Sequence, residues 1–147
     1  MNLVEHYRPR GFDCVCGNLR MAARAVSSVY DRHLAPVGLQ ASQMAVLWAV
    51  AGLSGASVKA IARRIAMGET SLLRNLRVLE RDGLVALGVD PADRRQRLVT
   101  LTRAGEATFA KALPRWEQAQ QEVAGALEKA GVGEFNARLV KLAQAVK

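Results

Sequence analysis

The chain is 147 residues long and half of it is hydrophobic, so it has the size and apolar content of one domain with a real core. Its net charge is +8 and its sequence pI is about 10.3, which favours a polyanionic partner, either a nucleic acid or a membrane surface. No apolar run reaches the roughly 18 residues of a membrane-spanning helix, and the first six residues lack the charged-then-apolar order of a secretory signal. We therefore expect a cytoplasmic protein.

Helical periodicity dominates the first half of the sequence. Apolar residues at three- and four-residue spacing predict an amphipathic helix over about 12–34 and a second helix around 44–51. Ser57 can cap a third, short helix, and Gly68 separates that helix from a fourth over about 69–82. One side of the fourth helix is expected to be buried and carries Leu72, Leu73, Leu76 and Leu79.

The pattern changes in the second half. Strand-like apolar segments over 84–89 and 97–101 are joined by turn residues, which predicts a hairpin with a basic tip. A long helix is expected over about 103–129, with apolar residues at heptad spacing at Phe109, Leu113, Trp116, Val123 and Leu127. In a last helix the aligned apolar residues are Phe135, Leu139, Leu142 and Val146. The predicted fold is mainly α with a small β-hairpin.

This order of elements is that of a winged helix-turn-helix, in which the second helix of the motif enters the major groove of double-stranded DNA. The distribution of charge agrees with that interpretation. Segment 57–103 carries ten Lys or Arg and five Asp or Glu, a net +5, whereas the other 100 residues share +3. Because the positive charge gathers on the predicted motif and hairpin, DNA is favoured over a membrane as the partner.

The polar face of the fourth helix supplies the first candidate DNA contacts. At 100° per residue, the side opposite the leucines carries Thr70, Arg74, Arg77 and Arg81, with Ser71 flanking them. Residues near the start of a recognition helix reach base edges, and Arg suits bidentate contact with guanine. Arg81, near the far end, is a phosphate candidate. For any single arginine, a solvated helix face is the alternative.

The hairpin tip supplies the second set of contacts. Arg94, Arg95 and Arg97 repel one another unless phosphates neutralise them, and an arginine at such a tip can enter a narrow minor groove. Asp93 is expected to pair with Arg95 and hold it in position. Ser57, at the start of the third helix, completes the candidate set.

Two segments resemble the MarR (multiple antibiotic resistance regulator) family. Residues 93–105, Asp-Arg-Arg-Gln-Arg-Leu-Val-Thr-Leu-Thr-Arg-Ala-Gly, are similar to the family's wing signature of Asp-x-Arg, a strand, then Leu-Thr-x-x-Gly. Residues 79–85 resemble the end of its recognition helix, and Leu39 with Gln43 resembles the start of its second helix. The sequence departs from the family at Gly68 and Glu69, where a capping polar residue and a basic or small residue are common.

The resemblance implies one domain over 1–147. Helices within about 1–35 and 103–147 would form a homodimer, and about 39–102 would form the DNA-binding lobe. It further implies a repressor that binds an inverted-repeat operator, with Arg95 inserted from the wing and supported by Asp93. Family members often bind small aromatic acids between the dimer helices and the lobe. Candidate residues for such a pocket are Arg20, Arg24, Met44 and Trp48.

The pair Cys14 and Cys16 leaves three interpretations open. Free cysteines are most often small core residues, so a buried structural role is one. A redox sensor is the second, because the peroxide-sensing branch of the family has a reactive cysteine early in its first helix; Tyr30 lies in similar register to a supporting tyrosine there, and Arg20 can favour the thiolate. A metal site with His6 or His33 is the third, although two cysteines alone supply too few ligands.

Other functional classes are weakly supported. No catalytic spacing, glycine-rich phosphate loop or metalloprotease motif is present, so neither an enzyme nor a cofactor is expected. The best enzymatic alternative is a thiol-based, peroxide-reactive protein that uses Cys16. A winged helix used for protein contacts is the remaining alternative, and binding to DNA upstream of its own gene separates that possibility from a regulator.

Overall fold

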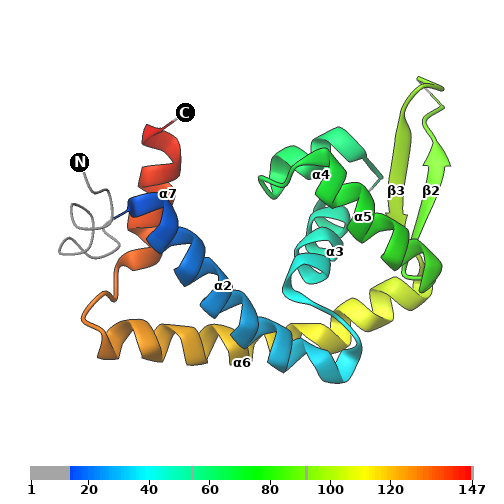
Figure 1. Ribbon diagram of the computed structural model, residues 1–147. Helices are drawn as coiled ribbons and strands as arrows, with labels where there is room; N and C mark the ends of the chain where they lie inside the picture. Colours follow the sequence, from blue (N-terminus) through cyan, green and yellow to red (C-terminus); the bar gives the residue numbers. More distant parts are fainter. Residues whose placement is uncertain (1–13, 54, 92, 147) are drawn as a thin grey trace, which may run out of the picture.

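The structure, a computed structural model, describes residues 14–53, 55–91 and 93–146. The elements, labelled as in Figure 1, are α2 (Val15–Leu34), the short 3-10 helix η2 (Ala35–Val37), α3 (Ala41–Leu53), β1 (Ala56–Ser57), α4 (Val58–Arg64), α5 (Glu69–Arg81), β2 (Val85–Val89), β3 (Arg97–Leu101), α6 (Arg103–Lys129) and α7 (Phe135–Ala145). Figure 1 shows a lobe made of α3, α4, α5 and the strands, and an arm in which α2, α6 and α7 extend away from it.

The predicted helices and the hairpin are confirmed within one to three residues at most ends. The start of the first helix, predicted near residue 12, lies outside the described residues. Two short elements were not predicted, the 3-10 helix η2 and the strand β1. The two-residue β1 pairs antiparallel with β3 through Ala56 with Val99 and Ser57 with Leu98. The sheet therefore has three strands in the order β1-β3-β2, and the hairpin is joined to the segment that leads into α4.

The core lies inside the lobe. Its largest buried side chains come from α3, α4, α5 and the inner strand β3, together with the last residue of α2: Leu34, Met44, Leu47, Ile61, Leu72, Leu76, Leu79 and Val99. The prediction for Leu73 is wrong, because 40% of this residue is exposed. Leu73 follows Leu72 by one residue, which turns it 100° around the helix and away from the core.

The sequence signature at the start of α6 has a steric basis. Thr102 caps the helix, since its hydroxyl oxygen accepts from the Gly105 amide at 3.0 Å and its hydroxyl donates to the Gly83 carbonyl at 2.6 Å. The helix passes so close to the end of α5 that a Cβ on Gly105 would lie 1.9 Å from the Leu84 carbonyl oxygen. A glycine is therefore required where α6 crosses this loop.

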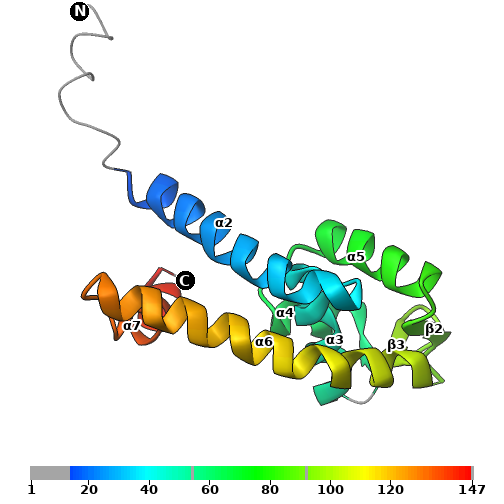
Figure 2. The same cartoon turned by 90° about the horizontal axis from the view of Figure 1, so that it is seen from below.

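The apolar stripe of α6 divides between two neighbourhoods. Its first members, Phe109, Leu113 and Trp116, pack against the lobe core. Val123 and Leu127 instead line a cavity of about 510 Å³ between α2, α6 and α7. The same arm exposes several apolar side chains, namely Val15 (67%), Met21 (58%), Val140 (51%) and Val146 (74%). Figure 2 shows α2 and α6 running side by side along the arm.

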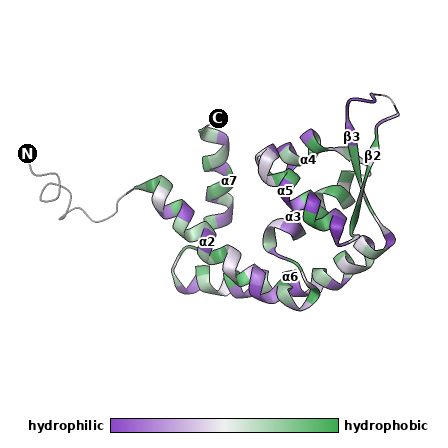
Figure 3. Cartoon of the chain, turned by 45° about the vertical axis from the view of Figure 1, so that its right-hand side comes forward, coloured by the Kyte–Doolittle hydropathy of each residue, from purple (hydrophilic) through white to green (hydrophobic). Residues whose placement is uncertain are grey.

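Hydropathy changes sharply along the hairpin. Figure 3 shows largely apolar strands β2 and β3 below a hydrophilic loop that joins them, which we call the wing loop. Among the described residues, no single helix is long and apolar enough to cross a bilayer, although α2 with η2 and α3 would satisfy that test jointly as a pair bent by 74°.

Candidate nucleic-acid interface and neighbouring cavity

The outer face of α5 carries the first set of candidate contacts. Thr70, Ser71, Arg74, Arg77 and Arg81 are all exposed, so the structure brings these five predicted residues onto one accessible helix. Arg81 differs from the others because its Nε lies 3.0 Å from the Asp82 carboxylate. The remaining arginines of α5 form no ion pair within the described residues, so their charge is available to a polyanion.

The wing loop carries the second set, and its backbone is ordered by one carboxylate. Asp93 Oδ1 accepts from the Arg95 amide at 3.0 Å and from Arg95 Nε at 3.3 Å, while Oδ2 accepts from Gln96 Nε2 at 3.2 Å. The bond from the Arg95 amide, followed by that from Gln96, lowers the pKa of Asp93 below its ordinary value of 3.8. Most of the Arg95 side chain, 93% of it, stays exposed. The expected Asp93–Arg95 pair is therefore present.

The other two wing arginines and Ser57 lie around this loop. Arg94 is exposed beside Arg95, and Arg97 is exposed at the start of β3, where it pairs with Val89 in the hairpin. Ser57 caps α4, because its hydroxyl oxygen accepts from the Ala60 amide at 3.2 Å.

Asn75 is a residue that sequence reasoning missed. It lies on α5 between the buried and exposed faces, and it accepts from the Ser42 hydroxyl of α3 at 3.0 Å. Its own amide donates to the Ser71 carbonyl at 3.0 Å. An asparagine inside a helix is a poor helix former, and that was the available signal for a tertiary role. The contact fixes the orientation of α5 on α3.

A cavity of about 430 Å³ lies behind the helix-turn-helix, where α2, α3 and α6 meet the end of α4. Met44 and Trp48 line it as predicted. Arg20 and Arg24 are not among the residues that line it, and the cation at the cavity is Arg64. Within this chain, the cationic residue of the cavity is therefore Arg64 of α4 and not the predicted Arg20 or Arg24 of α2.

Aromatic rings form much of the cavity wall. The Trp48 ring centroid lies 5.0 Å from that of Trp116 and 5.6 Å from that of Phe109, and Tyr30 lies 6.5 Å from Trp116. Burial raises the pKa of Tyr30 above its ordinary value of 10.0. The cavity thus combines flat apolar surfaces with one guanidinium, a composition suited to an aromatic anion.

The two cysteines are exposed in the single chain, so the lobe core does not bury them. Cys16 and Tyr30 share α2, and fourteen residues of helix separate them by about 21 Å, so they do not meet within one chain. Across residues 14–53, 55–91 and 93–146 no group of three His, Cys, Asp or Glu could hold a metal ion. His6, named as a possible ligand, lies outside the described residues.

Comparison with known proteins agrees with this geometry. A sequence profile of the MarR family matches residues 37–96. Transcriptional regulator HosA of Escherichia coli O111:H- is 35% identical over 85 residues, which are 58% of this chain and 63% of HosA. This chain matches about half the length, 51%, of a second curated relative, a transcriptional activatory protein of Rhodopseudomonas palustris.

Solved structures match over more of the chain. The Mycobacterium tuberculosis transcriptional regulator MosR in complex with DNA is 35% identical, with a TM-score of 0.76 over 92% of this chain and 99% of MosR. Bordetella bronchiseptica BpsR, whose DNA binding is regulated by 6-hydroxynicotinic acid, is 28% identical, with a TM-score of 0.79 over 89% of this chain and 94% of BpsR. From the family profile across the helix-turn-helix and wing, and from a relative matched over nearly its whole length, we conclude that the chain belongs to the MarR family.

Proposed function

We propose that this protein is a cytoplasmic transcriptional regulator that binds an inverted-repeat operator as a homodimer and acts as a repressor. The observation that carries the proposal is the ordered wing loop, in which Asp93 holds the backbone of Arg95 while the guanidinium stays exposed. The loop projects beyond α5, the helix that carries the other exposed arginines (Figure 1). The DNA-bound state of the relative MosR supports the same interpretation.

The arginines have different tasks on DNA. Arg74 and Arg77, on the exposed face of α5, read or clamp the major groove. Arg95 enters the neighbouring minor groove from the wing, and Arg94 and Arg97 bind phosphates beside it. A residue that reads a base affects sequence preference, whereas a residue that binds phosphate affects all sequences alike and contributes to the salt dependence.

The test uses an operator selected from a random duplex library with wild-type protein. Arg74→Ala should relax preference at one position and cost about 1–3 kcal/mol of binding free energy, and Arg94→Ala should lower the salt slope by about one. Arg95→Ala should abolish tight binding, and Asp93→Ala should imitate it more weakly. Lys111→Ala, exposed on α6 beside η2, is the matched control and should bind as wild type does. Wild-type affinity in the Arg95→Ala protein would refute the wing assignment.

The homodimer is proposed from the arm. Val15, Met21, Val140 and Val146 are more than half exposed in one chain, and apolar surface of this extent on neighbouring helices favours burial against a second copy. Sedimentation or light scattering at micromolar concentration tests this. A monomeric mass would rule out the dimer and, with it, the inverted-repeat operator.

A small aromatic acid is proposed as the effector of the 430 Å³ cavity, with its ring against Trp48 and Trp116 and its carboxylate on Arg64. The regulation of BpsR by 6-hydroxynicotinic acid supports this class of ligand. The chain has two tryptophans and both line the cavity, so intrinsic fluorescence reports directly on occupancy. Arg64→Ala should weaken binding of hydroxybenzoates and 6-hydroxynicotinic acid but leave the binding of their neutral amides unchanged. Equal loss for acids and amides would refute the carboxylate assignment.

Thiol oxidation is a second candidate for the releasing signal, favoured by the exposure of Cys14 and Cys16. Mild peroxide should then release DNA from the wild-type protein and leave the Cys16→Ser protein bound. If peroxide leaves wild-type binding unchanged, the aromatic-acid signal is the one retained.

A further inference from the structure

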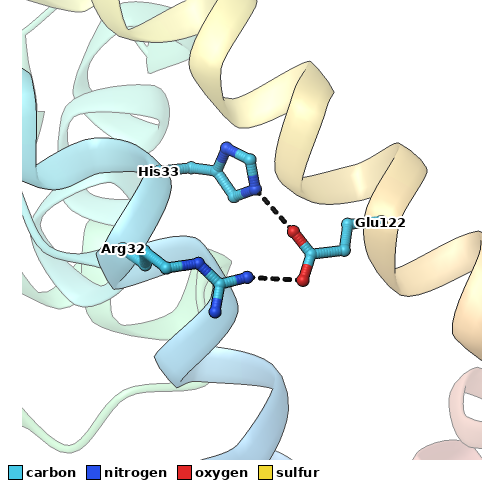
Figure 4. A network of polar contacts seen from close by, with 3 residues as sticks. All are labelled: Arg32, His33 and Glu122. Atoms are coloured by element: carbon cyan, nitrogen blue, oxygen red, sulfur yellow. Dashed lines mark hydrogen bonds and ion pairs between the residues drawn. The ribbon is translucent and has the colours of Figure 1, made fainter.

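A polar bridge joins the last turn of α2 to the middle of α6. Glu122 of α6 forms an ion pair with Arg32 through Oε1, and its Oε2 lies 2.8 Å from His33 Nε2 (Figure 4). Two residues earlier on each helix, the Tyr30 hydroxyl donates to the Gln120 side-chain carbonyl. The hydrogen bond from His33, followed by that from Arg32, lowers the pKa of Glu122 below its ordinary value of 4.5. The carboxylate thus stays ionised and holds two consecutive residues of α2.

The bridge lies where the arm continues into the lobe. Leu34, the next residue after His33, is fully buried in the lobe core, and α2 then passes through η2 to α3. The start of α3 is tied back to the same turn, because the Ala41 amide donates to Asp31 Oδ1 at 2.7 Å. From α3 the Ser42–Asn75 hydrogen bond reaches α5. A continuous series of contacts therefore connects the last turn of α2 with the recognition helix α5.

We propose that Glu122 is a positioning residue for operator binding, because by holding Arg32 and His33 it fixes how the DNA-binding lobe stands on α6. The inference rests on the proposed function, in which two lobes of one dimer bind two half-sites. Half-sites of a helix-turn-helix dimer are spaced by about one turn of DNA or a multiple of it, so both lobes have to be at the correct separation simultaneously. A lobe that is already held in place loses less conformational freedom when the second half-site binds.

The exposure of the bridge separates positioning from folding. The Arg32 and Glu122 side chains are 62% and 46% exposed, and exposed ion pairs contribute little to the stability of a fold. Removal of the bridge is therefore expected to leave the protein folded. Because the dimer has two bridges, and DNA binding depends on both lobes at once, the effect is expected on full operators only.

The test compares Glu122→Gln with wild type on two duplexes. One is the full operator selected with wild-type protein, and the other retains one half-site with the second half scrambled. Glu122→Gln should bind the full operator about fivefold more weakly, since one exposed bridge is lost from each of the two subunits. It should bind the half-site as wild type does. The salt slope should stay unchanged, because no phosphate contact is removed. Glu117→Gln is the control, with the same charge change on α6 at an exposed residue that forms no ion pair within the described residues.

Arg32→Met provides the second variant, since it removes one of the two α2 partners of Glu122 from the other helix. It should reproduce the selective loss, and the double variant should lose no more than Glu122→Gln alone. Unchanged affinity of Glu122→Gln for the full operator, or an equal loss on both duplexes, would overturn the positioning role. If wild-type protein selects no operator, the proposed function itself fails and the inference falls with it.

Discussion

The substitution Gly105→Ala tests the steric basis of the wing signature. Its Cβ would lie 1.9 Å from the Leu84 carbonyl oxygen and 2.9 Å from the Leu84 carbonyl carbon. The oxygen would have to move by about 1.5 Å to reach ordinary contact at 3.4 Å. That oxygen also accepts a hydrogen bond from the Thr102 amide at 3.1 Å, so the movement would break this bond beside the N-terminal cap of α6. Overpacking of backbone typically costs about 1–3 kcal/mol and each lost hydrogen bond about 1 kcal/mol, so we expect a loss of about 3 kcal/mol.

Thermal and urea unfolding measure this loss. For a chain of this size, 3 kcal/mol corresponds to a decrease in Tm of about 6–12 °C. The matched control is Gly125→Ala in the same helix, where a Cβ would meet nothing within 4 Å. Alanine is the better helix former, so the control should raise the free energy of unfolding by up to about 1 kcal/mol. If Gly105→Ala unfolds at or above the wild-type Tm, the close approach of α6 to Leu84 is not present in solution.

Three further predictions follow from local geometry. Ala66, in the turn between α4 and α5, has a φ of 50°, a strained value for a residue with a Cβ, so Ala66→Gly should raise the free energy of unfolding by about 0.5 kcal/mol. A lower free energy of unfolding in urea would contradict that strain. Asn75→Ala removes the Ser42 contact and should lower stability by about 1–2 kcal/mol in the same assay, whereas no change would show that the contact is not formed. The pKa of Asp93 is lowered in the folded loop, so its stabilising contribution is present above pH 3.8 and is lost as the pH falls through the pKa of the folded state. Protection of the Arg95 amide from hydrogen exchange should therefore persist at pH 5 and decline in more acid solution. Protection that is independent of pH would contradict the role of the carboxylate.

The fold was largely predictable because its elements are long and periodic. The α5 leucines and the strand pairs Val85–Leu101 and Leu87–Val99 follow helical and alternating spacing that a sequence displays directly. The β1 strand was missed because two residues contain no period. Its pairing with β3 depends on a contact between segments about forty residues apart, which no local pattern records.

The candidate site was predictable to a smaller extent. Arginine faces on α5 and the wing follow from helix rotation and turn chemistry, and the Asp93–Arg95 pair follows from two residues in one loop. The cavity requires tertiary packing, so sequence reasoning selected Arg20 and Arg24 from the arm where the structure places Arg64 from α4. The role of Cys14 and Cys16 stayed open for a related reason, since helix periodicity does not say whether a helix end has a neighbour.

The pairing of β1 with β3 has a consequence for how target recognition can diversify within such a chain. The hairpin is held along the middle of β3 by β1, which pairs with Leu98 and Val99, and at its root by the crowded crossing at Gly105, whereas its far end is closed by the Asp90 amide bonded to the Gln96 carbonyl at 3.1 Å. Insertions, deletions or exchanges of residues between Asp90 and Gln96 alter the reach of the loop and leave the pairing of β2 with β3 in the same register. Mutational variation at the tip of the hairpin therefore changes the reach and charge of the loop and costs the local contacts of Asp93, while the root stays constant.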